Sequence, residues 1–146
     1  MKVSMLLEII NNLQADDLDN IYALDGAPFG SSGNDTITEF PCIGLTEMEI
    51  DPARNGKKEK AVVITEIFTN MDYFKCINVK ELKEFLNQIK DKDEKVYIVA
   101  PLQYYTGWYV PVLNCMKREE DTYSSDDSYQ LKMRQITGEN ILHLIF

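Results

Sequence analysis

The sequence contains few of the residues from which catalytic and metal sites are commonly built. It has one histidine, His143, and three cysteines, Cys42, Cys76 and Cys115, none of which form a CxxC pair. This set makes no cluster of zinc ligands, and we predict no metal, no cofactor and no catalytic residues. A Cys–His pair stays open as an alternative, because sequence spacing does not say which side chains meet in space. We interpret the cysteines as small buried side chains in a reducing compartment.

Basic residues are also scarce. The chain has 15 Lys and Arg against 24 Asp and Glu, giving a formal net charge of −9. Such a balance argues against direct binding to nucleic acid and to anionic membranes, both of which attract cations. It suits a protein partner with a basic face, although net acidity is also an ordinary route to solubility.

Long apolar runs are absent, and so are the usual phosphate and calcium motifs. No run is long enough to span a membrane, and Glu8 interrupts the first apolar run before it reaches the length of a secretion signal. We therefore predict a cytoplasmic protein. The glycine-rich residues 25–35 match neither GxGxxG nor GxxxxGK[ST], and the acidic residues 116–129 do not match a calcium-binding loop. Both segments are interpreted as loops.

Two stretches of the chain share one pattern. In each, five apolar positions at i, i+3, i+6, i+7 and i+10 make the stripe of an amphipathic helix about three turns long. The second helix has a capping box, with Asn78 as N-cap and Glu81 three residues later, and the first helix lacks one. The matched apolar positions, 76 residues apart, are Val3, Leu6, Ile9, Ile10 and Leu13 against Val79, Leu82, Phe85, Leu86 and Ile89.

The likeness continues beyond the helices. Residues 21–24 align with 96–99 with their tyrosines coincident, 40–43 align with 110–113 with their prolines coincident, and 61–67 align with 131–137. We therefore predict an α+β fold that is a tandem pseudo-repeat of a helix followed by three antiparallel strands, with two helices packed on an antiparallel sheet. Residues 1–146 would form one globular domain of two pseudo-repeats, about 1–70 and about 77–146, because units this small hold marginal cores alone. The alternative to duplication is that any helix resembles another helix and any strand another strand, so that the alignment matches only their common periodicity.

Three local predictions follow from the pattern. The continuous apolar run 61–64 is typical of a central strand covered on both faces. The apolar residues 141–146 predict a last strand in the sheet. In such a strand His143 points opposite to Leu142 and Leu144, which predicts a surface or edge position for the histidine.

Aromatic residues crowd one short connection in the second half. Tyr104, Tyr105, Trp108 and Tyr109 lie within six residues together with a glycine. Large amphipathic rings on a tight loop are typical of binding hot spots, and these four residues are the candidate contact surface for a partner. The same rings could instead cover the end of a small core as cross-strand pairs.

The opening of the second half, residues 78–86, followed by an acidic turn and a strand at 96–98, resembles the start of many short bacteriophage and prophage proteins of unknown function. The resemblance covers about 25 residues in each half, counted on the sequence. It implies a mobile-element origin and a binding or regulatory role. It carries no catalytic residues.

These observations favour a non-enzymatic protein that binds another protein through its acidic surface and the aromatic residues. A sharper version is an acidic inhibitor that occupies a basic nucleic-acid groove on its target. A second possibility is a small-ligand or enzymatic site at the junction of the halves, around Tyr104, Trp108, Cys115 and His143. A third is a structural subunit of a homo-oligomer.

Overall fold

The structure is a computed structural model, and it describes residues 1–24, 39–66, 75–99, 108–117 and 141–146. Within these ranges it has two helices and seven strands, so the α+β class predicted from the sequence is confirmed. The elements in chain order are α1 (Val3–Asn12), β1 (Asn20–Leu24), β2 (Glu39–Ile50), β3 (Glu59–Glu66), α2 (Val79–Gln88), β4 (Lys95–Val99), β5 (Tyr109–Pro111), β6 (Asn114–Lys117) and β7 (Ile141–Ile145). The expected strand at 131–137, the interpreted loop at 25–35 and residues 118–129 of the interpreted loop 116–129 lie outside the described residues. Residues 116 and 117 of that predicted loop belong to β6.

The helices begin as their sequences predict. At the start of α2, the Asn78 side chain accepts a hydrogen bond from the Glu81 backbone N–H, and the Glu81 carboxylate accepts one from the Asn78 N–H, both at 2.9 Å. This reciprocal pair satisfies two N–H groups that the helix itself leaves free. Helix α1 has Lys2 at the same place and no side-chain cap. The capping box therefore stabilises the second helix alone.

The strands form one mixed sheet in the order β5-β4-β3-β2-β1-β7-β6. The prediction of an antiparallel sheet with three strands in each half is wrong in two respects. The pairs β3–β4 and β1–β7 are parallel, and the described residues of the second half already contain four strands instead of three. Both parallel pairs join one half of the chain to the other, and an order read along the sequence does not reveal such long-range partners.

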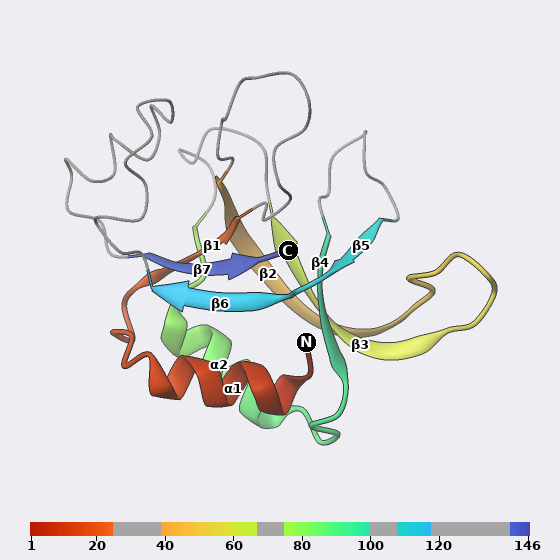
Figure 1. Ribbon diagram of the computed structural model, residues 1–146, viewed down its shortest axis with the longest axis horizontal. Helices are drawn as coiled ribbons and strands as arrows, with labels where there is room; N and C mark the ends of the chain where they lie inside the picture. Colours follow the sequence, from red (N-terminus) through yellow and green to blue (C-terminus); the bar gives the residue numbers. More distant parts are fainter. Residues whose placement is uncertain (25–38, 67–74, 100–107, 118–140) are drawn as a thin grey trace.

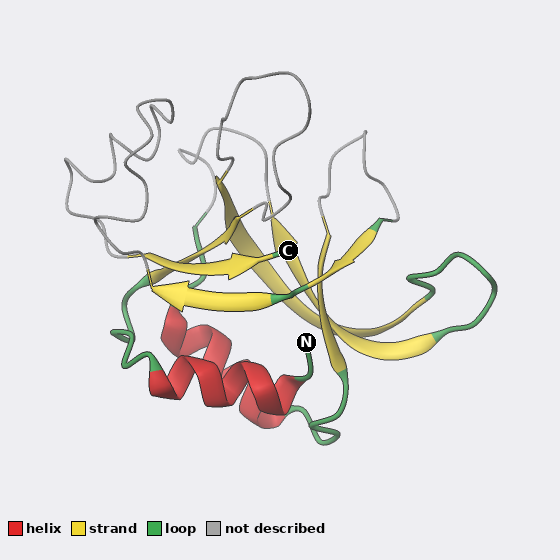
Figure 2. Cartoon of the chain, viewed as in Figure 1, coloured by secondary structure: helices red, strands yellow, loops and turns green. Residues whose placement is uncertain are grey.

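The sheet curls so that its two edge strands, β5 and β6, follow each other directly in the chain. Residues 39–41 of β2 pair with β1 and residues 42–50 pair with β3, with a shift in register between Cys42 and Gly44. On the opposite side β5 pairs with β4 and β6 pairs with β7, and the two strands are separated only by Val112 and Leu113. Figure 2 shows this curled arrangement above the two helices. Pro111 is the last residue of the edge strand β5, a position where a missing backbone N–H costs the hydrogen-bond ladder little.

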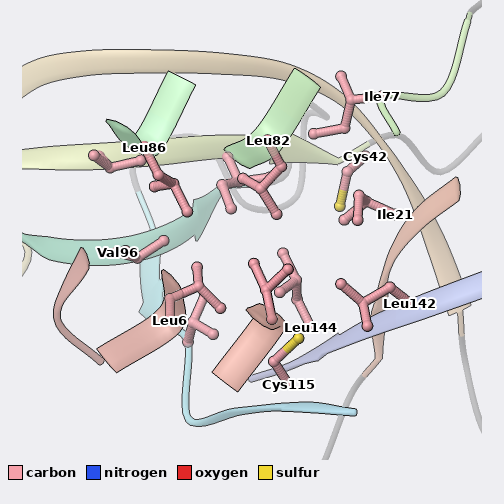
Figure 3. Close-up of a cluster of buried hydrophobic side chains, with 14 of the residues drawn as sticks. Leu6, Ile21, Cys42, Ile77, Leu82, Leu86, Val96, Cys115, Leu142 and Leu144 are labelled. Atoms are coloured by element: carbon pink, nitrogen blue, oxygen red, sulfur yellow. The ribbon is translucent and has the colours of Figure 1, made fainter. Parts of the chain in front are cut away.

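One apolar core joins the helices to the sheet. Its helical members are Val3, Leu6 and Ile10 from α1, with Val79, Leu82 and Leu86 from α2. In Figure 3 the side chains of both helices meet those of strands from both halves, including Ile21, Cys42, Val96, Cys115, Leu142 and Leu144. Both helices lie on the same side of the sheet, as Figure 1 shows, and the core takes members from each half of the chain.

Strand β3 is buried on both faces, as the apolar run 61–64 predicted. Val62 and Ile64 face the main core, whereas Ala61 and Val63 belong to a second apolar cluster on the other face of the sheet. The second cluster comprises Ile50, Ala61, Val63 and Tyr97, with Val99 and Tyr109 packed against it. This strand has a partner on each side, β2 and β4, which completes its burial.

The prediction for His143 is wrong. The terminal strand exists, but the histidine has 0% of its surface exposed. Strand β7 lies between β1 and β6, and by register His143 is opposite Tyr22 on one side and Met116 on the other. The alternation of side chains along a strand predicts which residues share a face of the sheet, but it does not predict whether a face is covered. In β7 both faces are covered.

Candidate functional site

Two of the four candidate aromatic residues lie in the described part of the chain. Trp108 directly precedes β5 and has 57% of its surface exposed. Tyr109, the first residue of β5, is opposite Val99 and packs against the second apolar cluster. The two neighbours therefore have different environments, one in solvent and one half-buried. Tyr104 and Tyr105 lie outside the described residues.

The turn between β2 and β3 brings a cation to Trp108. The guanidinium carbon of Arg54 lies 4.8 Å from the centroid of the Trp108 ring, which is cation–π geometry. This contact joins residues that are far apart in the sequence, and nothing in the sequence pattern pointed to it. It places the turn, which Figure 1 shows extending from the ends of β2 and β3, over the start of β5.

Asp51 determines the shape of this turn. Its carboxylate accepts hydrogen bonds from the backbone N–H groups of Asn55 at 3.1 Å and Gly56 at 2.7 Å, and its carbonyl accepts one from Arg54. Arg54 and Gly56 both have positive φ, 53° and 81°. A left-handed backbone conformation is unfavourable for an arginine, and the hydrogen bonds to Asp51 stabilise this conformation at Arg54.

The cations of the turn differ from the other cations nearby. Arg54, Lys57 and Lys58 are exposed, and among the described residues no carboxylate forms a salt bridge with them. By contrast Lys60 contacts Glu47, and Lys95 contacts Glu59 at 3.0 Å. We call Arg54, Lys57, Lys58 and Trp108 the basic turn surface. It is a locally positive region of a chain whose net charge is −9.

A second feature is a hollow of about 410 Å³ beside the turn from α2 to β4. All of the residues that line it are charged: Glu59, Lys60, Lys90, Asp91, Asp93, Glu94 and Lys95. Several of these charges are already paired with each other or with neighbours, as in Lys95 with Glu59 and Lys2 with Asp93. A ligand would therefore have to compete with ion pairs that the protein already makes.

Glu94 is the most unusual side chain at this hollow. Its side chain is 4% exposed, Lys60 lies 3.5 Å from one carboxylate oxygen, and the other oxygen is buried without a hydrogen bond. Burial raises the pKa of Glu94, and the nearby charge of Glu47 adds to the effect. The pKa of Glu47 is lowered, mainly because Lys60 donates a hydrogen bond to it. Lys60 thus contacts two carboxylates, Glu47 and Glu94. Of these two, Glu94 has the raised pKa and is the more readily protonated.

The proposed junction site is not assembled in the described residues. Cys115 and His143 lie on the adjacent strands β6 and β7, where Cys115 is opposite Leu144 and His143 is opposite Met116. Cross-strand partners share a face and successive residues alternate, so the thiol and the imidazole point to opposite faces. Trp108 is in solvent, whereas Cys115 belongs to the main core.

The three thiols share a buried environment. All three cysteines are free and buried, which agrees with their interpretation as small core residues. Burial raises the pKa of Cys115 to about 12 and also raises that of Cys42, which Cys76 and Glu66 raise further. A thiol held in its protonated form is a poor nucleophile at neutral pH.

The comparisons with known proteins found no relative. No protein-family model, curated protein or solved structure matches the chain significantly. Within the described residues, neither helix has the length and apolar character that crossing a bilayer requires, and no three His, Cys, Asp or Glu side chains gather where they could hold a metal ion.

Proposed function

We propose that the protein is a non-enzymatic binding protein whose contact with a protein partner is centred on Trp108. The observation that carries this proposal is the position of the single tryptophan, which is 57% exposed, lies beneath the Arg54 guanidinium and directly precedes Tyr109, a residue packed against the second apolar cluster. Tryptophan and arginine are the residues most enriched in binding hot spots. An indole that the fold leaves in solvent is available to be desolvated by a partner.

The overall charge supports a role in association as well. A net charge of −9 attracts basic partners and accelerates their encounter most strongly at low ionic strength. The acidic-inhibitor version of the function rests on this charge and on the resemblance to phage proteins. At short range the charges beside Trp108 have the opposite sign, so long-range attraction and the local contact are separate contributions to binding.

We also propose that the chain is an internal duplication folded as a single domain. Supporting this, hydrogen bonds between the halves recur in matched form. The backbone N–H of Val3 donates to the carbonyl of Glu94, and that of Val79 donates to the carbonyl of Asp19, both at 2.9 Å. Val3 and Val79 are 76 residues apart, and Asp19 and Glu94 are 75 apart, the separations at which the sequence halves align.

The strand registers support the duplication in the same way. Tyr22 is opposite Pro41 in the first half, and Tyr97 is opposite Pro111 in the second. The parallel pairs also correspond, because Val62 is opposite Val96 while Leu142 is opposite Ile21. This makes β7 the counterpart of β3 and places Leu142 80 residues after Val62, whereas the sequence alignment matched residues 61–67 with 131–137. The residue before each helix also bridges a strand of the other half, Lys2 with Lys95 of β4 and Asn78 with Asn20 of β1, so a lone half would lack part of its interior.

The binding proposal is tested by two matched alanine variants. Trp108→Ala removes the exposed indole, and Leu18→Ala removes an apolar side chain that is 78% exposed, in the connection between α1 and β1. We expect a partner captured by the wild-type protein and by Leu18→Ala to be lost with Trp108→Ala. The captured protein is then purified and its affinity for the three forms is measured by calorimetry. Equal affinity for all three would refute the proposal.

Light scattering of the wild-type protein separates this function from the third possibility. A monomer at micromolar concentration is the expected result. A stable homo-oligomer that Trp108→Ala dissociates would instead assign the surface to self-association, in which case the protein is a structural subunit.

A further inference from the structure

We propose that the basic turn surface binds an acidic segment of the partner protein. This inference rests on the proposed function and adds the chemistry of the partner at Trp108. The evidence is the combination of exposed cations, their lack of carboxylate partners in the described residues, and an exposed indole in contact with one of them.

The local charge is positive because residues 51–58 hold three cations, Arg54, Lys57 and Lys58, against one carboxylate, Asp51. Asp51 accepts two backbone hydrogen bonds inside the turn. Glu59 accepts hydrogen bonds from Lys95 at 3.0 Å and from the Tyr97 hydroxyl at 2.6 Å. Arg54, Lys57 and Lys58 therefore remain to interact with a partner.

The net charge of the chain does not cancel this local field. Salt at physiological strength screens exposed charges beyond a distance of about 8 Å. The charges nearest to a bound segment therefore determine whether an acidic or a basic segment is favoured at the contact. A basic segment would face three cations at short range, whereas an acidic segment would gain ion pairs with them.

The surface also has an apolar component. Trp108 is 57% exposed, and Met48 of β2 is 39% exposed. Met48 is opposite Ala61 in the ladder and so lies on the face of the second apolar cluster, against which Tyr109 packs. An acidic segment that includes one or two apolar side chains could use both kinds of contact.

A protein segment fits this surface better than a nucleic acid does. Three cations would neutralise few phosphates, and affinity for nucleic acid grows with the number of phosphates neutralised. The other charges of this acidic chain would repel the rest of a long polyanion. A peptide can place a few carboxylates at the turn without extending a continuous negative charge across the molecule.

The test uses the full chain and the fluorescence of Trp108, its single tryptophan. The probe is a short peptide of glutamates around a central pair of leucines, without aromatic residues. Matched peptides replace the glutamates with glutamines or with lysines. We expect the glutamate peptide to bind about tenfold more tightly than the glutamine peptide, a ratio in keeping with three exposed ion pairs of ordinary strength. The advantage should shrink as salt is raised.

Two double variants with the same change in charge locate the binding surface. Lys57→Gln with Lys58→Gln removes two cations of the basic turn surface, and affinity for the glutamate peptide should fall about threefold to tenfold. Lys75→Gln with Lys80→Gln removes two exposed lysines, one shortly before α2 and one in its first turn, which pair with Glu81 and Glu84, and should leave affinity unchanged. Equal losses in the two double variants would overturn the inference.

Other outcomes also overturn it. Tighter binding of the lysine peptide would mean that the partner is basic at this surface, and tighter binding of oligothymidylate would mean a nucleic acid. Self-association that the Lys57 and Lys58 substitutions abolish would make the occupant a second copy of the chain. If the glutamate peptide fails but a partner still distinguishes Trp108→Ala from Leu18→Ala, this inference fails and the proposed function stands. If that distinction is lost too, both fail.

Discussion

Removal of the capping box at the start of α2 gives a direct measure of how the helices are held. Asn78→Ala eliminates the side-chain oxygen that accepts the Glu81 N–H and leaves that N–H without its partner. Loss of an N-cap of this kind costs about 1 kcal/mol of folding free energy. For a chain of 146 residues, an unfolding entropy of about 2.1 cal/mol/K per residue converts this cost into a fall in Tm of about 3 °C.

Lys2→Ala is the matched control, because Lys2 occupies the N-cap of α1 and forms no side-chain cap. Its loss removes a salt bridge to Asp93 in which both side chains are largely exposed, 51% and 76%. Such pairs contribute about 0–1 kcal/mol, with most exposed pairs near the lower end. Urea unfolding followed by circular dichroism compares the two variants with the wild type. A cost for Lys2→Ala equal to that of Asn78→Ala would refute the reasoning, as would no cost for Asn78→Ala.

Two further predictions concern the core and the buried carboxylate. Leu6→Ala and Leu82→Ala should each lower the unfolding free energy by about 2–5 kcal/mol, since both side chains are fully buried. Urea unfolding measures both costs, and a cost below about 1 kcal/mol at either position would contradict the burial of these side chains. The pKa of Glu94 is raised by burial, so the protonated form is favoured in the folded state and ionisation opposes folding as pH rises through that pKa. Glu94→Gln should therefore become more stable relative to the wild type between about pH 4 and about pH 7, and a relative stability that falls over this range would contradict the assignment.

Much of the local structure could be predicted from the sequence. The spacing of apolar residues located both helices, and the Asn78 and Glu81 pair located the start of the second. Short apolar runs located β1, β3, β4 and β7. These features depend on residues within a few positions of one another, where helix and strand periodicity are informative.

The long-range pairings could not be predicted in the same way. The parallel pairs β1–β7 and β3–β4 join distant segments. Pairing of β7 with β1 on one side and β6 on the other explains why His143 does not lie at an edge. The contact between Arg54 and Trp108 also depends on how the turn folds back, which is determined by the Asp51 hydrogen bonds. Neither the charge pattern nor the hydrophobic pattern along the chain predicts the parallel strand pairs or the contact between Arg54 and Trp108.

The environment of Trp108 provides the most direct test of the account. Quenching of its fluorescence by iodide and by caesium, at matched ionic strength, reports both exposure and the sign of the nearby charge. We predict that iodide quenches more strongly than caesium despite the net charge of −9, because Arg54 lies 4.8 Å from the ring and Lys57 and Lys58 are exposed nearby in the chain. The preference should decrease when Lys57 and Lys58 are changed to glutamine. Stronger quenching by caesium, or no quenching by either ion, would contradict the account.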